Sequence, residues 1–197
     1  MTLQNNIEAG GDVAGGNIDK SHKSYHFNVP ANGHVSLLQP FLDIIEKLEK
    51  GHEVDIENEL EDIDHYSQQH RTDKRGLAQK LNDSGRAYMV DEALRYKMKA
   101  ARFILKNQDK PALQYLIGRI LSKIKITYDS LVVPLIQADA PIQTIEEIIF
   151  KEVITPIQNT LIGTPLSSND DCVIHLMYFL AGNGFVAQRF EMQSAPN

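Results

Sequence analysis

The sequence contains a single cysteine, no tryptophan and no long uninterrupted hydrophobic run. A lone cysteine, Cys172, excludes an internal disulfide framework. The longest apolar stretch, residues 131–136, contains a proline and is far too short to cross a bilayer as a helix. The polar N-terminal residues lack the apolar core of a secretory signal. These absences predict a soluble protein of the cytoplasm.

An excess of positive charge is also missing, since the 197 residues carry a formal net charge of −6. A generic nucleic-acid-binding protein needs concentrated positive charge to contact phosphates, so only a local basic patch would give this function. Hydrophobic residues make up 42% of the chain, which is enough to bury a core. The length fits one domain with a tail.

The first 34 residues are rich in glycine and lack helical periodicity. Two similar units follow one another at residues 10–13 and 15–18, and each pairs two glycines with a polar and a β-branched residue. Residues 25–29 alternate between apolar and polar side chains, which is typical of a short strand. The glycine-rich run at residues 10–18 lacks the Gly-Lys-Ser/Thr ending of a phosphate loop. We therefore expect residues 1–34 to form an interaction arm whose partner-binding residues are Asp12, Val13, Asn17 and Ile18.

Helical spacing begins after this arm. Phe41, Ile44, Ile45 and Leu48 form one apolar face, and similar patterns recur along the chain. The pattern predicts a mainly α fold, a single helical domain of about six to seven helices over residues 35–192, with a tail at 193–197. Proline 134 should kink or end one of the helices.

The last predicted helix runs from Asp170 to Ala181 and is followed by Gly182, Asn183 and Gly184. Glycine and asparagine accept the left-handed backbone angles that end helices. Residues 185–190 then alternate in a pattern that predicts a closing strand, which would pair with residues 25–29.

Catalytic and metal-binding patterns are weak. His65 and His70 are five residues apart, whereas two ligands on one helix face need a spacing of three or four. Cys172 lies in the first turn of a helix, but Asp170 and Asp171 beside it oppose a lowered thiol pKa. We expect no catalytic residue, no metal site and no cofactor.

The segment 71–106 holds ten of the chain's 20 lysine and arginine residues. It directly follows an acidic run at residues 53–64, so the two segments could pair with one another. A patch on this segment would bind either an acidic partner or nucleic acid. The candidate residues are Lys74, Arg75, Lys80 and Arg86.

Three motifs, taken in order, are similar to a known family. The first is Lys74-Arg75-Gly76-Leu77, followed by a helix ending Ala101-Arg102-Phe103. The second comprises the apolar runs at 131–136, 145–149 and 153–157. The third is the structural C-terminal motif, a helix with paired aromatics that runs into a Gly-Asn turn: Tyr178, Phe179, Gly182 and Asn183. The chain resembles the C-terminal-domain-type component of bacterial ABC-three-component (ABC-3C) conflict and antiphage defence systems.

This resemblance implies a non-enzymatic adaptor that links an SMC- or ABC-type ATPase sensor to an effector, such as a nuclease, encoded nearby. It implies protein–protein contacts, indirect DNA contact and no membrane association. Two other functions stay open: a DNA-contacting accessory module that uses the basic 71–106 segment, and an immunity or regulatory protein that inhibits an effector.

Overall fold

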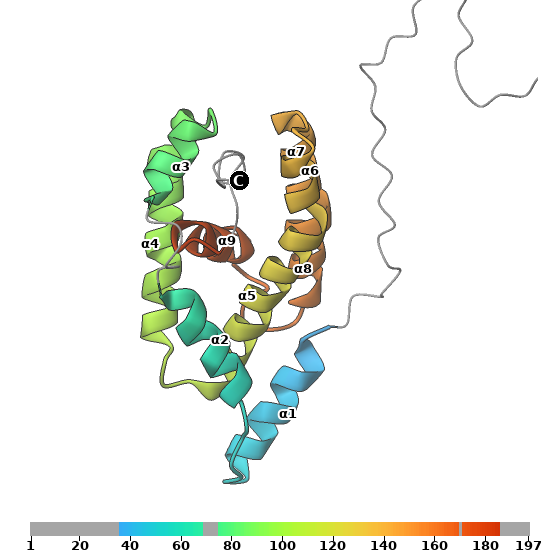
Figure 1. Cartoon of the computed structure of the whole chain (residues 1–197). Coiled ribbons are helices and arrows are strands. Elements are labelled where there is room, and N and C mark those ends of the chain that lie inside the picture. The colour runs from blue at the N-terminus through green and yellow to red at the C-terminus, as the bar shows by residue number, and fades with distance from the viewer. Residues whose placement is uncertain (1–35, 69–74, 170, 186–197) are drawn as a thin grey trace, which may run out of the picture. The chain divides into compact units, whose positions relative to one another are not determined.

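A computed structural model describes residues 36–68, 75–169 and 171–185. The chain divides into two units, residues 1–31 and 32–197, and all the described residues belong to the second unit. Every regular element among them is helical (Figure 1), which confirms the mainly α prediction for this part of the chain. The N-terminal arm and its strand lie outside the described residues, as does the closing strand apart from Phe185.

The α-helices range in length from five residues in α6 (Val133–Gln137) to 21 residues in α5 (Pro111–Leu131). In chain order the elements are α1 (Leu38–Glu49), α2 (Glu57–Ser67), α3 (Leu77–Asp83), the 3-10 turn η1 (Ala87–Met89), α4 (Val90–Lys106), α5 (Pro111–Leu131), α6 (Val133–Gln137), α7 (Ile142–Ile148), the π-helical segment η2 (Ile149–Ile154), α8 (Thr155–Thr160) and α9 (Cys172–Gly182).

Prolines stand at two of the breaks between helices. Pro134 lies in the first turn of α6, and Pro156 lies in the first turn of α8. Proline has no backbone N–H to donate, so it suits the start of a helix and interrupts one that would continue through it. The interruption at Val132 agrees with the predicted break near Pro134. Ahead of Pro156 the helix does not end, because α7 continues directly into the wider π-helical turn of η2.

Helices α5 and α9 form the centre of the core. Leu116, Ile117, Ile120, Leu121 and Ile124 of α5 are completely buried. Most of α9 is also buried, and it packs against α4, which it crosses in Figure 1. The buried face of α4 includes the small residues Ala93 and Ala100, which allow another helix to approach closely. A central helix with few polar side chains is what the sequence of α9 favours.

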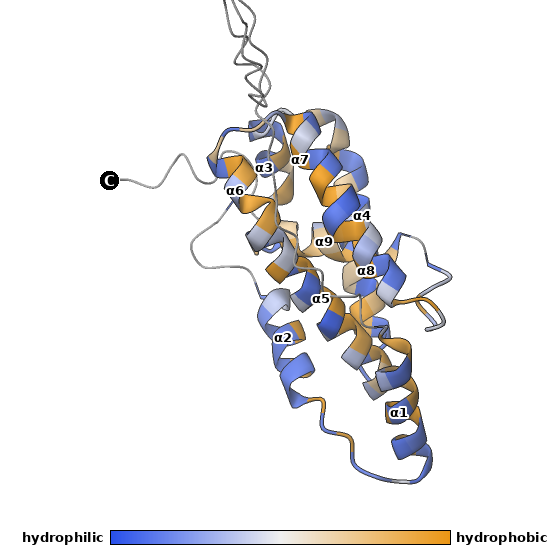
Figure 2. Cartoon of the chain, turned by 90° about the vertical axis from the view of Figure 1, so that its right-hand side faces the viewer, coloured by the Kyte–Doolittle hydropathy of each residue, from blue (hydrophilic) through white to orange (hydrophobic). Residues whose placement is uncertain are grey.

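Helix α2 packs against α5 at a close crossing. A Cβ atom at Gly118 would lie 2.7 Å from Cβ of Glu59 and 2.8 Å from its backbone oxygen. Only glycine therefore fits at this point of α5. Most of α2 is hydrophilic (Figure 2), and only Ile63 on this helix is buried. The acidic run is thus largely a solvated helix surface.

None of the helices in the described ranges combines the length and apolar character that a bilayer-spanning helix requires.

Candidate functional site

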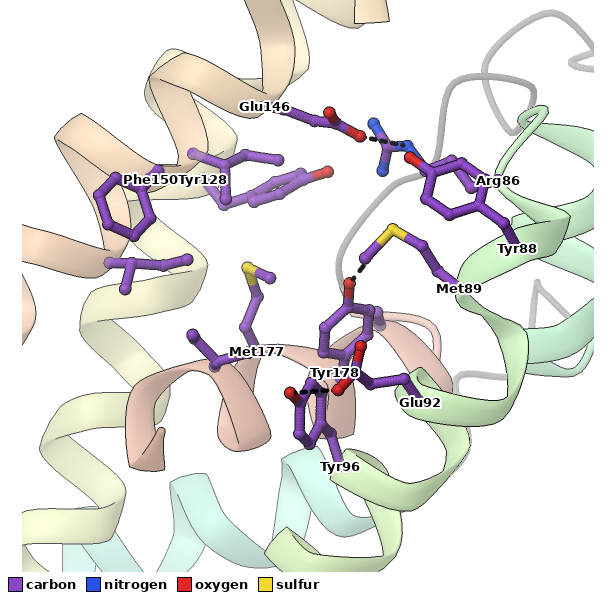
Figure 3. A pocket seen from close by; sticks show the side chains of 14 residues that line it. Arg86, Tyr88, Met89, Glu92, Tyr96, Tyr128, Glu146, Phe150, Met177 and Tyr178 are labelled. Atoms are coloured by element: carbon purple, nitrogen blue, oxygen red, sulfur yellow. Dashed lines mark hydrogen bonds and ion pairs between the residues drawn. The ribbon is translucent and has the colours of Figure 1, made fainter. Parts of the chain in front are cut away.

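A cavity of about 430 Å³ opens between α4, α5, α7, η2 and α9 (Figure 3). Helix α9 contributes Met177 and Tyr178 to one side. Ile174 and Ala181 also come from α9, and the remaining lining residues come from segments that are distant from it in the sequence. The full lining consists of Arg86, Tyr88, Met89, Glu92, Tyr96, Tyr128, Glu146, Ile149, Phe150, Ile154, Ile174, Met177, Tyr178 and Ala181.

Local structure explains how these side chains reach the cavity. Met89 closes the turn η1 with a backbone hydrogen bond to Arg86 of 2.9 Å, which places Tyr88 and Met89 at the start of α4. Glu92 and Tyr96 follow on the same face of α4, four residues apart. On the opposite side, the π-helical segment η2 contributes Ile149, Phe150 and Ile154. π-Helical turns are frequent at functional sites in proteins.

An ion pair joins the two sides of the cavity. Nε of Arg86 lies 3.4 Å from a carboxylate oxygen of Glu146 on α7 (Figure 3). The Arg86 side chain is only 11% exposed, whereas that of Glu146 is 43% exposed. Because the arginine is buried, its charge depends on a nearby carboxylate for compensation. The pair therefore fixes η1 relative to α7 at the edge of the cavity.

Four of the lining residues are tyrosines, and the hydroxyls of two of them make hydrogen bonds within the lining. The Tyr178 hydroxyl donates to Sδ of Met89 at 3.9 Å, and the Tyr96 hydroxyl donates to Glu92 at 2.7 Å (Figure 3). Burial raises the pKa of Tyr178 to about 12, with a smaller opposing effect from Arg86. The hydrogen bond to Glu92 raises the pKa of Tyr96. Both phenols are therefore neutral donors at physiological pH.

The cavity lining is mainly apolar, with a few polar groups. It contains isoleucine, methionine and aromatic side chains, and none of its described residues is a serine, cysteine, histidine or lysine. Apolar pockets with a few polar groups are typical binding sites. This arrangement suits an apolar or aromatic group with a polar end that meets Arg86 or Glu146.

The C-terminal motif forms the end of α9. Nζ of Lys97 donates to the carbonyl oxygen of Gly182 at 2.9 Å, and Nζ of Lys80 donates to that of Ala181 at 3.2 Å. The amide of Asn183 donates to the carbonyl of Tyr66 at 2.9 Å. Tyr178 and Phe179 are buried. The motif is therefore a structural junction that holds α9 against α2, α3 and α4.

A family model matches this part of the chain. The model of C-terminal domain 9 of the ABC-three component (ABC-3C) systems matches residues 76–187, more than half of the sequence. The chain belongs to this family. The match begins at α3 and includes the whole of α9, so it contains the cavity and the C-terminal motif. No curated protein and no solved structure matches the chain.

Two of the four residues expected to form a basic surface patch are buried in the structure of this ABC-3C domain. Lys80 is 1% exposed, and Arg86 is 9% exposed with its ion pair to Glu146. Arg75 lies 3.4 Å from Asp83. Lys74, like the arm residues Asp12, Val13, Asn17 and Ile18, lies outside the described residues. Two of the four residues are thus interior side chains, and the exposed cations Arg95, Lys99, Arg102 and Lys106 of the basic segment lie on α4.

The burial of Lys80 was not predicted from the sequence, although the helical spacing of its neighbours indicates it. Leu77, Lys80, Leu81 and Ser84 follow helical spacing, and the three of them besides Lys80 are buried together. Lys80 therefore occupies a position on the inner face of α3. The cavity had no such signal, because its lining comes from elements that the sequence separates widely.

Cys172 and His175 of the ABC-3C domain border a second hollow of about 290 Å³ together with Lys99. Burial raises the pKa of the Cys172 thiol to about 12, so the thiol is protonated at neutral pH. Burial lowers the pKa of His175, and the charge of Lys99 lowers it further. A protonated thiol is a poor nucleophile, so this pair is a packed part of the core. Among the described residues, no group of three or more His, Cys, Asp or Glu side chains has a metal-site arrangement.

Proposed function

We propose that this chain is a non-enzymatic adaptor of an ABC-3C antiphage defence complex. It would act in the cytoplasm and join an SMC- or ABC-type ATPase sensor to an effector through protein–protein contacts. One observation carries the proposal: the residues matched by the ABC-3C family model include every residue that lines the cavity. The domain that the family shares is thus also the part that forms an apolar binding site.

The chemistry of the cavity supports a binding role. Phe150 is 60% exposed and Tyr88 is 75% exposed at its border. Exposed aromatic side chains around an apolar hollow are typical of the central contacts in protein interfaces. The Arg86–Glu146 pair offers both a donor and an acceptor to a partner's polar groups. A partner that inserts one apolar side chain would use all these features.

The N-terminal arm is the second proposed contact. Asp12, Val13, Asn17 and Ile18 would add to the edge of a partner's sheet, where main-chain hydrogen bonds supply affinity and alternate side chains supply specificity. Replacement of Val13 and Ile18 by aspartate would place one charge in each of the two similar units at residues 10–13 and 15–18. The helical domain would still fold, because these residues lie outside its core elements.

The test is affinity purification of the tagged chain, expressed with its neighbouring genes, followed by mass spectrometry. We expect stoichiometric recovery of an ATPase and an effector. The variant Phe150→Asp should lose at least one of them, because it places a charge at the cavity. The control Ile126→Asp changes an equally exposed apolar residue, 66% exposed, that does not line the cavity, and it should retain both.

Three outcomes separate the two contacts. Loss of a partner with Phe150→Asp alone assigns that partner to the cavity, and loss with Val13→Asp/Ile18→Asp alone assigns it to the arm. Recovery of the unmodified chain without any partner, at both low and high salt, would contradict the adaptor function as a whole. Circular dichroism of each variant ensures that a loss of partner does not reflect unfolding.

A further inference from the structure

The outer face of α4 carries an apolar stripe that no described residue covers. Leu94, Met98 and Leu105 are 38%, 54% and 66% exposed, and Ala101 between them is also exposed. Their spacing of four, three and four residues is the heptad spacing of a coiled-coil seam. Over this span the stripe is about 17 Å long, since a helix rises about 1.5 Å per residue. The inner face of the same helix, with Ala93, is already packed in the core.

A row of cations runs beside this stripe. Arg95, Lys99, Arg102 and Lys106 each follow one of the stripe residues directly, so they repeat with the same spacing. All four are exposed. Arg95 pairs with Glu92 at 2.9 Å, whereas Lys99, Arg102 and Lys106 form no ion pair within the described part of the chain. A shallow hollow on this face is lined by Asp91, Leu94, Arg95, Met98, Lys99 and Arg102.

The acidic helix of the chain does not neutralise this row. α2 packs against α5, and among the described residues no ion pair joins α2 to α4. The cations therefore add a strong positive edge to an apolar surface in a protein whose net charge is −6. Such an edge favours a partner that carries acidic side chains next to its own apolar seam.

We propose that the outer face of α4 binds an acidic amphipathic helix of a partner subunit. Leucines or similar residues of that helix would pack on Leu94, Met98, Ala101 and Leu105, and its flanking carboxylates would pair with Lys99, Arg102 and Lys106. This inference rests on the proposed adaptor function and adds the chemistry of one partner segment. The face shares no lining residue with the cavity, although its Arg95 pairs with Glu92, which lines the cavity.

The first experiment measures binding of a synthetic helix to the full chain by fluorescence anisotropy. The probe is a peptide of about 21 residues with leucine at the a and d positions and glutamate at the e and g positions. Repulsion between its glutamates keeps this peptide monomeric. We expect binding that weakens at least tenfold in Lys99→Glu/Arg102→Glu. A second peptide with lysine in place of glutamate should show the reverse preference and bind this variant better than the unmodified chain.

The matched control is Lys47→Glu/Lys151→Glu, which makes the same change of net charge on α1 and η2. It should bind the acidic peptide like the unmodified chain. Met98→Asp tests the apolar stripe without reversing any cation, and it should also weaken binding at least tenfold. Met98, Lys99 and Arg102 are all exposed, so the thermal unfolding midpoint of both α4 variants should equal that of the unmodified chain. Equal binding of both peptides, or equal loss in the control, would overturn the proposal.

The second experiment repeats the affinity purification with Lys99→Glu/Arg102→Glu. The inference is supported if the unmodified chain recovers its partners and the variant loses one of them. Recovery of the same set by both overturns it while the adaptor function stands, whereas an unmodified chain without partners contradicts the adaptor function itself. Two other results would assign the face to another occupant and overturn the proposal. They are duplex DNA binding lost in the variant while peptide binding persists, and a dimer in sedimentation that the variant abolishes.

Discussion

Lys97 of α4 donates a hydrogen bond of 2.9 Å from Nζ to the carbonyl oxygen of Gly182 at the end of α9. The last carbonyls of a helix have no partner within the helix, and they carry the negative end of its dipole. Lys80 contacts the preceding carbonyl, of Ala181. Burial lowers the pKa of Lys97, and the nearby charge of Lys80 lowers it further. Two lysines from different helices thus complete the C-terminal end of α9.

Replacing Lys97 by methionine should lower the free energy of unfolding by about 1–2 kcal/mol, since it keeps the aliphatic stem and removes a charged donor. Lys80→Met should do the same. Urea unfolding monitored by circular dichroism measures the change. Lys151→Met, at a lysine whose side chain is 79% exposed, is the control and should have almost no effect. Equal stability of all three variants would show that the contacts at α9 contribute nothing.

Gly118→Ala should be destabilising by about 1–3 kcal/mol, the usual cost of overpacking a core. The added Cβ would lie 2.7–3.0 Å from Glu59, two of whose three nearest atoms belong to the backbone, so α2 must shift away from α5. Gly76→Ser is the matched control, because a Cβ at Gly76 meets nothing within 4 Å and serine suits the start of α3. Thermal unfolding of both variants tests the difference, and an alanine that leaves the midpoint unchanged would contradict the close crossing.

Alkaline pH should destabilise the protein partly through Cys172. The pKa of its thiol is raised from 9.0 to about 12 by burial, so between these values the unfolded chain releases a proton that the folded chain retains. The free energy of unfolding therefore falls as pH rises above 9, with a slope of up to about one proton, or roughly 1.4 kcal/mol per pH unit. Tyr178, raised from 10.0 to about 12, adds a similar slope above pH 10.

The variant Cys172→Ala removes the thiol contribution and should reduce this slope by about one proton. Urea titrations at several pH values between 8 and 11 measure it. The native thiol should also resist alkylation at neutral pH and react once the protein unfolds. Rapid alkylation of the folded protein would contradict the buried position.

Acid pH should destabilise the protein through His175. The His175 side chain is buried, and the centroid of its ring lies 4.7 Å from that of Tyr96. Its Nε2 has no hydrogen-bond partner in the described part of the chain. Burial first, then Lys99 and Arg95, lower its pKa below 6.5, while Asp171 opposes them. The unfolded chain thus binds a proton first as pH falls below 6.5, so stability is lost below that pH.

His175→Phe keeps a buried ring and cannot be protonated. Its stability should therefore fall less than that of the unmodified protein between pH 6.5 and pH 5. Chemical unfolding at both pH values compares the two. An identical loss in both proteins would mean that other groups account for the acid sensitivity.

The sequence predicts the helices better than it predicts their faces. α1 and α5 follow from clear apolar periodicity, and proline marks the break before α6. Helix α4 carries apolar residues on two faces, and periodicity alone cannot tell which of them is buried. The structure shows that Ala93, Ala100 and Ile104 are buried, while Met98 is exposed. Small side chains are selected inside because they let the helices pack closely.

The expected basic patch illustrates a second limit. Charged residues are mostly exposed, so Lys80 and Arg86 are reasonable surface candidates by composition. Each is buried because a distant element supplies its partner, the end of α9 for Lys80 and α7 for Arg86. Pairings between residues about 60 or 100 positions apart leave no local pattern in the sequence. The cavity was unpredictable for the same reason.

The lysine contacts at the end of α9 also have a mechanical consequence. Lys97 projects from the inner side of the helix whose outer side carries Lys99 and Arg102. A displacement of α4 would therefore also move α9, because the two helices pack together and share this hydrogen bond, and α9 supplies Met177 and Tyr178 to the cavity. The outer face of α4 and the cavity are thus connected through the contact between α4 and α9, so a partner bound on that face would act on residues that line the cavity.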